Sequence, residues 1–174
     1  YRNEARIFLG CVAKIKTLEF VEKYLTERNI NYSVDRRPNY NCFTVRFATL
    51  KFLFNRTHLY DENKTKTVYP DFMNLPREKT ANILRGLIET DGSIGEKEIS
   101  LSSTSLSIIE NARYMLLRLG ALASGYSKPN DIGKEHTMKN GRKITSRKLP
   151  YVLRINRIKD ITDFFELAPK GEHF

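Results

Sequence analysis

The sequence predicts an α+β fold built from two similar halves. The order strand, helix, hairpin, helix and loop occurs twice along the 174 residues. The two copies are about 91 residues apart, so that Leu18 aligns with Ile109 and Asn29 aligns with Gly120. Apolar residues alternate in the expected strands and recur every three or four positions in the expected helices. A chain of this length can bury one core, or two smaller ones that share an interface.

The first half is expected to span residues 1–75. Alternation indicates a strand over residues 6–14, with Ile7, Leu9, Cys11 and Ala13 on one side and Arg6, Phe8, Gly10, Val12 and Lys14 on the other. Thr17 is a suitable N-cap for the helix that follows, and Asn29 is a suitable end. The expected elements are a helix at 18–28, a hairpin at 32–47 with its turn at 37–39, a second helix at 49–60 and a polar loop at 61–70.

The second half is expected to span residues 76–174 and to begin with a helix over 76–92. Pro76 suits the first turn of this helix, and Gly92 is expected to end it in a left-handed conformation. Asn140-Gly141 is typical of a tight hairpin turn. The remaining expected elements are a strand at 99–102, a helix at 107–119, a basic segment at 126–148, a strand at 149–156 and a last helix at 158–167.

The charge of the chain points to an anionic partner. The formal net charge is +10 and the isoelectric point is near 9.6. Nucleic acid and anionic membranes are the usual partners of such proteins. No apolar run approaches the roughly 20 residues that span a bilayer, so nucleic acid is favoured. Cys11 and Cys42 are predicted to be buried free thiols, which together with the absence of a signal peptide predicts an intracellular protein.

Residues 84–94, LRGLIETDGSI, lie near the middle of the chain and are read as the end of the 76–92 helix. Leu84 and Ile88 share an apolar face, whereas Gly86 and Thr90 form a nearly smooth face that another backbone could approach closely. Two acids near a helix C-terminus oppose the helix dipole. A divalent metal would offset that cost, although an acidic, solvated helix end is the alternative interpretation.

This stretch resembles the LAGLIDADG motif of homing endonucleases, including those carried inside inteins. Glu89 stands where the motif has Asp, and Arg85 and Thr90 replace alanines. The resemblance implies two pseudo-symmetric αββαββα-type halves that form a DNA-binding β-saddle, with the motif helix at the interface between the halves. The residues that match the motif are Leu84, Gly86, Leu87, Ile88, Asp91 and Gly92.

The position of the motif within the chain is unusual for the family. Proteins of this kind have two motifs in one chain, or one motif near the N-terminus of each subunit of a homodimer. Here a single motif lies in the middle with a half on either side. The chain therefore looks like a two-motif protein that begins just after its first motif. We expect an upstream segment or a second chain to supply the other motif helix.

The resemblance also implies the chemistry, which is double-strand DNA cleavage with Mg²⁺ or Mn²⁺. Asp91 matches the acid that holds the metal, and the backbone carbonyl of Thr90 could add a ligand. A lysine following the last helix of each half would lie near the scissile phosphate, and Lys170, Lys66 or Lys64 match that place. A solvated loop lysine is the alternative for each of the three.

DNA contacts are expected on the outward faces of the strands and along the basic segment. The candidates are Arg6, Lys14, Arg36, Arg37, Thr44, Arg46, Ser100, Ser102, Lys128, Lys139, Arg142, Lys143, Arg147, Lys148, Arg154 and Asn156. The alternative function is a catalytically degenerate DNA- or RNA-binding module of the same fold, such as a maturase or a regulator. Asp91 favours the enzyme, because a pure binding module has no need of an acid that repels phosphate.

Overall fold

The computed structural model describes residues 4–10, 15–37, 42–48, 59–62, 65–95, 97–137, 141 and 143–156. The chain divides into two compact units, the first described up to residue 48 and the second from residue 59 onwards. The sequence assigned residues 59–75 to the first half, whereas their contacts group them with the second unit. In the ranges just given, no helix has both the length and the apolar character needed to span a membrane.

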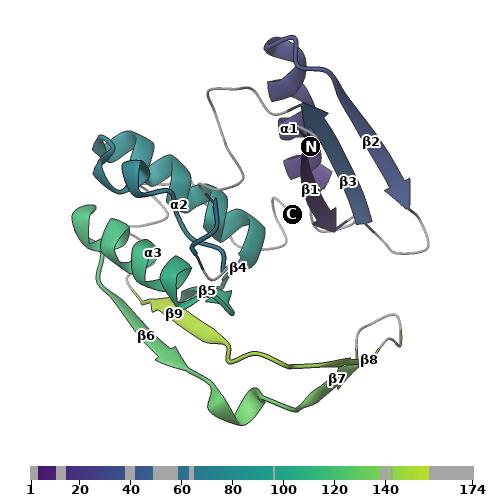
Figure 1. Cartoon of the computed structure of the whole chain (residues 1–174). Coiled ribbons are helices and arrows are strands. Elements are labelled where there is room, and N and C mark those ends of the chain that lie inside the picture. The colour runs from purple at the N-terminus through teal and green to yellow at the C-terminus, as the bar shows by residue number, and fades with distance from the viewer. Residues whose placement is uncertain are drawn as a thin grey trace. The chain divides into compact units, whose positions relative to one another are not determined.

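The first unit is a three-stranded antiparallel sheet covered on one face by a helix (Figure 1). Its strand order is β1-β3-β2. Ile7 pairs with Val45 and Leu9 with Phe43, and these side chains pack against the helix. The elements are β1 (Glu4–Gly10), α1 (Ile15–Glu27), β2 (Tyr32–Arg37) and β3 (Cys42–Ala48). The predicted strand alternation is therefore confirmed.

Helix α1 begins before the predicted cap and ends at the predicted residue. It starts at Ile15, so the prediction that Thr17 is its N-cap was wrong. Asn29 has a φ of 53°, the left-handed conformation that ends many helices. The N–H of Ile30 then donates to the carbonyl of Leu25 at 2.9 Å, which closes the helix end.

The second unit is a four-stranded sheet with α2 and α3 packed on one face (Figure 1). The strand order is β4-β5-β9-β6, and a β7-β8 ribbon extends beyond β6 and β9. The elements are η3 (Pro70–Asn74), α2 (Arg77–Asp91), β4 (Gly92–Ile94), β5 (Ile99–Ser103), α3 (Leu106–Arg118), β6 (Ala123–Ser127), η4 (Pro129–Asp131), β7 (Glu135–Thr137), β8 (Lys143–Thr145) and β9 (Tyr151–Ile155). The sequence did not predict β4 or β6.

The core of the second unit lies between the two helices and the sheet. α2 contributes Leu84 and Ile88, which are both buried. Burial of such side chains contributes about 1.5–3 kcal/mol each to folding. The other described apolar residues that are buried in this unit are Val68, Ala81, Ile94, Ile99, Leu101, Ile109, Ala112, Met115, Leu116, Leu119, Leu153 and Ile155, together with Val152 on the opposite face of the sheet.

The two units repeat one topology, as predicted. β1, α1, β2 and β3 of the first unit correspond to β5, α3, β6 and β9 of the second, and the strand orders β1-β3-β2 and β5-β9-β6 agree. The helix ends also agree, because Gly120 is left-handed like Asn29, with a φ of 86°. The N–H of Ala121 donates to the carbonyl of Leu116 at 2.9 Å, as Ile30 does to Leu25.

Two predicted helices are not tested by the structure. The helix expected at 158–167 lies outside the described residues, as does the part of the 49–60 helix up to residue 58. At the end of that range Tyr60 forms an antiparallel bridge with Lys66 and is not helical. The loop after Tyr60 is joined to α3, because the hydroxyl of Ser105 donates to the carbonyl of Lys66.

Candidate functional site

Gly92 joins α2 directly to the sheet. Its φ of −90° and ψ of 175° are extended, so the prediction of a left-handed helix end was wrong. A Cβ atom at Gly92 would collide with the backbone carbonyl of Ile88 and lie 2.9 Å from that of Ser100. The glycine is therefore required by close packing, since β4 passes directly from the helix end onto β5.

The two acids at the end of α2 have different surroundings. Arg85 Nε donates to Glu89 Oε1 at 2.7 Å, one helical turn apart. Asp91 is exposed, and among the described residues its carboxylate makes no hydrogen bond or ion pair. Asp91 is therefore the acid of the pair that is available to a ligand, while Glu89 is held along its own helix.

Gly86 and Thr90 define the smooth face of α2. Gly86 and Thr90 are both exposed, and a Cβ atom at Gly86 would meet nothing within 4 Å. The hydroxyl of Thr90 donates back to the carbonyl of Gly86 at 2.8 Å, so its polar group is satisfied inside the helix. This face can pack closely against another backbone without burying an unpaired hydroxyl.

The donors at this helix end fit a hard divalent cation that is only partly bound by protein. Asp91 supplies a carboxylate, and the last carbonyls of a helix, including that of Thr90, lack intrahelical partners. Across the described part of the chain, no three His, Cys, Asp or Glu side chains gather as a metal site. Mg²⁺ commonly binds one or two carboxylates and completes its shell with water and phosphate oxygens. The site therefore fits Mg²⁺ when a phosphate is also present.

The structure places one of the three predicted lysines. Lys66 is exposed in the loop that is anchored to Ser105 at the start of α3. No hydrogen bond or ion pair between described residues joins it to Asp91. Lys64 and Lys170 lie outside the described residues. The catalytic roles of all three stay predictions.

The outer face of the second sheet carries Arg154 in a row of serines. Ser100 on β5 and Ser124 on β6 lie opposite Arg154 of β9, and Ser93 lies opposite Ser100. The guanidinium is exposed and bonded to Glu98 Oε2 at 3.3 Å. Because serines are short, the arginine rises above its neighbours and can contact a ligand. This arrangement puts Ser100 and Arg154 side by side on one face, and their contacts with DNA stay predictions.

Tyr126 is a further candidate that the sequence did not single out. The guanidinium of Arg154 lies 5.3 Å from the centre of its ring, and Lys128 Nζ lies 5.7 Å from it. Both are within the usual range of cation–π contacts. Tyr126 and Ser102 lie on either side of Val152 on the outer face. These residues come together through the pairing of β6 with β9. Because the sequence did not predict β6, it gave no sign that Tyr126 lies beside Arg154.

The outer face of the first sheet is different. Arg6 lies opposite Arg46 on the face away from α1, as predicted. Arg46 pairs with Asp35 Oδ2 at 3.5 Å. Thr44 is only 4% exposed, so its prediction as a DNA contact was wrong. A short side chain in the central strand is covered by its larger neighbours, and it lies between Phe8 and Asp35.

The prediction that Arg36 lies on the outer face was also wrong. Arg36 pairs with Phe43, which belongs to the core under α1, and its guanidinium lies 5.8 Å from the Phe43 ring centre. Consecutive strand residues point to opposite faces, so Arg37 has the register of the outer face. The side chain of Arg37 and the whole of Lys14 lie outside the described residues.

The basic segment forms the β7-β8 ribbon and its approaches. Its acids are paired, Asp131 with Lys134 and Glu135 with Lys143, each at 2.7 Å. The hydrogen bond from Lys134 lowers the pKa of the Asp131 carboxyl. The remaining candidates that the structure describes lie at the surface: Lys128, Arg147, Lys148 and Asn156. Lys139 and Arg142 lie outside the described residues.

Comparison with known proteins gives both a family and a fold. A family described as the LAGLIDADG-like domain matches residues 78–168. The ATP-dependent DNA helicase Hel308 of Methanocaldococcus jannaschii is 32% identical over 123 residues, which is 69% of this chain but 10% of the helicase. The chain thus spans about a tenth of that relative.

Solved structures share the fold at low sequence identity. Variants of the homing endonuclease I-DmoI align with a TM-score of 0.59 and 13% identity, over 95% of this chain and 81% of theirs. I-DmoI has also been solved in complex with DNA and Mn, and with DNA and Ca. The N-terminal LAGLIDADG domain of DUF199/WhiA aligns with a TM-score of 0.50 and 17% identity, over 92% of this chain and 70% of that one.

Proposed function

Because the chain belongs to the LAGLIDADG-like domain family, we propose that it is a homing endonuclease that makes site-specific double-strand breaks in DNA. The observation that carries this proposal is Asp91. Its carboxylate is exposed and unpaired among the described residues, at the end of a helix whose dipole disfavours an acid. A cation bound there would remove this cost, and the neighbouring Arg85–Glu89 pair does not compete for it.

In the proposed reaction Asp91 and the Thr90 carbonyl would hold Mg²⁺ or Mn²⁺. The ion, when bound, activates water and stabilises charge on the leaving oxygen of the phosphodiester. The protein's own part is to fix Asp91, and Gly92 does so by tying the helix end to β5. A lysine such as Lys66 would stabilise charge on the phosphate. Structures of I-DmoI with DNA and Mn support the choice of partner and metal type.

Cutting both strands needs a second acid. We propose that another motif helix, from an upstream segment or a second chain, packs on the Gly86–Thr90 face. The space beside Gly86 supports this, because two helices can approach closely only where side chains are small. Each motif aspartate would then serve one DNA strand.

The decisive variant is Asp91→Asn, assayed for cleavage of target DNA with Mg²⁺ or Mn²⁺ and, separately, for DNA binding. We expect cleavage to be lost and binding to survive, because the amide keeps the shape but not the charge. The matched control is Glu78→Gln, an exposed acid in the first turn of the same helix, which should cleave normally. Cleavage by Asp91→Asn at the parental rate would refute the catalytic assignment.

DNA binding has its own signature. The excess of basic residues predicts several phosphate contacts, so the binding constant should fall steeply as salt rises. Titrating a labelled duplex at several salt concentrations measures this slope. A binding constant that does not change with salt concentration would contradict nucleic acid as the partner.

The second candidate is a binding module without catalysis. The WhiA domain shows that the fold is not confined to proteins called endonucleases. Tight binding by the parent, with no cleavage in Mg²⁺ or Mn²⁺ when a second motif helix is supplied, would establish this alternative.

We also propose that the domain is intein-encoded and intracellular. The match to a tenth of a helicase supports the first point, since an inserted element resembles only one part of a host protein. Sequencing the natural gene on both sides of residues 1–174 tests it. Flanking host sequence with splice junctions is expected, and a free-standing gene would contradict the proposal.

A further inference from the structure

Helix α3 has a second stripe outside its buried face, with a leucine at each end and two charged residues between them. Its inner face buries Ile109, Ala112, Met115 and Leu116. Leu106, Glu110, Arg113 and Leu117 follow one another at spacings of four, three and four, so they line a single outer face. All four are exposed, including 43% of Leu106 and 59% of Leu117.

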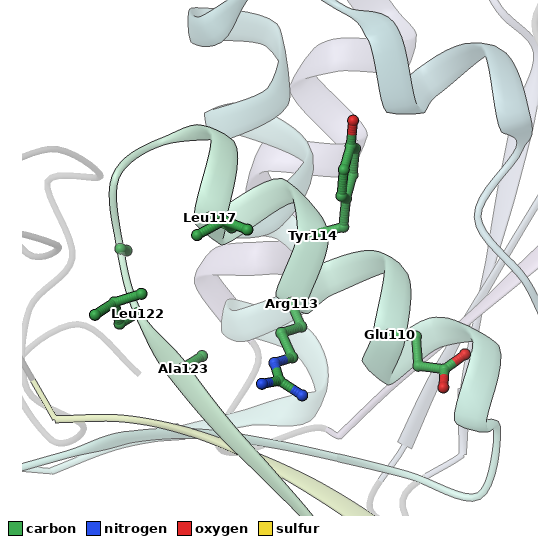
Figure 2. Close-up of a pocket in the computed structure, with 7 residues that line it drawn as sticks. Glu110, Arg113, Tyr114, Leu117, Leu122 and Ala123 are labelled. Carbon is green, nitrogen blue, oxygen red and sulfur yellow. The ribbon is translucent and has the colours of Figure 1, made fainter.

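The C-terminal end of this stripe borders a shallow pocket. Figure 2 shows Leu117 of α3 and Leu122 of the segment leading into β6, with Arg113 and Ala123 nearby. The pocket has a volume of about 310 Å³, and Leu122 is 66% exposed. Neither Glu110 nor Arg113 makes an ion pair or side-chain hydrogen bond among the residues that the structure describes. The surface therefore offers apolar area and two uncommitted charges of opposite sign.

The order of these residues makes the stripe complementary to itself. Laid antiparallel against an identical helix, Leu106 meets Leu117 of the other copy, and Glu110 meets Arg113. A twofold axis produces each of these contacts twice, as in isologous dimers. We propose that this face binds a second copy of the chain, α3 against α3, with each Leu106 packing into the pocket beside Leu117 and Leu122 of the other copy.

The repeat within the chain provides a comparison for this proposal. With the offset of 91, the stripe corresponds in α1 to Ile15, Glu19, Glu22 and Thr26. In an antiparallel pair of α1 helices Glu19 would meet Glu22, which is repulsive, and Ile15 would meet Thr26. The shared fold therefore does not require the self-complementary pattern, which α3 has and α1 lacks.

The proposed dimer is weak and leaves the polar face of the sheet open. A 13-residue helix is roughly 20 Å long, so one helix pair buries less than a standard stable interface. α3 packs on the face of the sheet opposite Arg154 and Ser124, since its contacts are with the core side of β5, β6 and β9. Association through α3 and contacts made by that polar face therefore use different surfaces.

Self-association of the full chain is measured by sedimentation equilibrium over a wide concentration range, at about 0.15 M salt. Screening over about 8 Å at this salt reduces the repulsion between two chains of net charge +10. Glu110→Arg alone and Arg113→Glu alone should each weaken the dimer about tenfold or more, because two attractive pairs become repulsive. An equimolar mixture of these two variants should associate again, since every cross-pair is then Arg against Glu.

The matched control is Glu19→Arg, the same change at the equivalent position of α1, which should leave association unchanged. Leu117→Ser should weaken the dimer without altering the charge. A parental chain that stays monomeric at every concentration would overturn the proposal, and the pocket would then be expected to bind a different partner. Charge variants that dimerise as well as the parent, or a mixture that fails to recover association, would overturn it as well.

Discussion

In the first unit the middle of the sheet's outer face holds Thr44 between Phe8 and Asp35, whereas the corresponding row of the second unit holds Arg154 between Ser100 and Ser124. Thr44 is buried at this position and Arg154 is exposed. The strand order and pairing are the same in both units. The backbone repeat therefore does not extend to the chemistry of the surface.

This difference has a consequence for recognition under the proposed function. A long cation above short hydroxyl neighbours can reach base edges, and arginine pairs bidentately with guanine in the major groove. In the first unit the middle of this face is the buried Thr44, and the cations Arg6 and Arg46 lie one pair further along the strands. Two halves with one fold are thus expected to contact the two ends of a DNA site unequally, which suits a non-palindromic target.

The largest expected effect is on stability and concerns Gly92, which joins α2 directly to the sheet of the second unit. Gly92→Ala should lower the free energy of unfolding by about 3 kcal/mol, because the new Cβ atom meets backbone that cannot move away. Thermal or denaturant unfolding measures this loss. The control is Gly86→Ala in the same motif, where there is open space and the change should stabilise the helix by about 0.5–1 kcal/mol. Equal stability of the two variants would show that the contact at Gly92 is not required.

The next effect tests the contrast between Arg154 and Thr44 directly. Arg154→Ala should reduce discrimination at one base pair by about 1–3 kcal/mol, as expected for a lost bidentate contact. Thr44→Ala should leave base discrimination unchanged, because its side chain is buried. Binding to a set of single-base variants of the target measures both. Loss of discrimination in Thr44→Ala alone would reverse the proposed roles of the two rows.

The smallest effect compares the two sides of the first sheet. Arg46→Ala should reduce the dependence of affinity on salt by about one phosphate contact, since Arg46 is on the outer face. Arg36→Ala should not, because Arg36 lies over the Phe43 ring on the side of α1. The slope of binding against salt concentration separates them. An equal change in both slopes would mean that DNA reaches the helix side as well.

Features set by neighbours along the chain could be predicted from the sequence. Alternation placed Ile7 and Leu9 on the core face, and helical spacing placed Leu84 and Ile88 in the core. The repeat aligned Asn29 with Gly120, and both end their helices in a left-handed conformation. The motif at 84–92 identified Asp91 as the candidate acid, because its residue types and spacing are local.

Features that depend on strands far apart in the sequence were decided by the tertiary structure. Alternation requires Arg36 and Arg37 to face opposite sides, but only pairing with β3 shows that Arg36 lies on the side of Phe43. The burial of Thr44 depends on its place in the central strand, and the need for glycine at position 92 depends on the approach of Ser100. Tyr126 meets Arg154 only because β6 pairs with β9. The sequence by itself determined the periodicity, the repeat and the acidic motif, whereas long-range pairing decided which side chains share a surface.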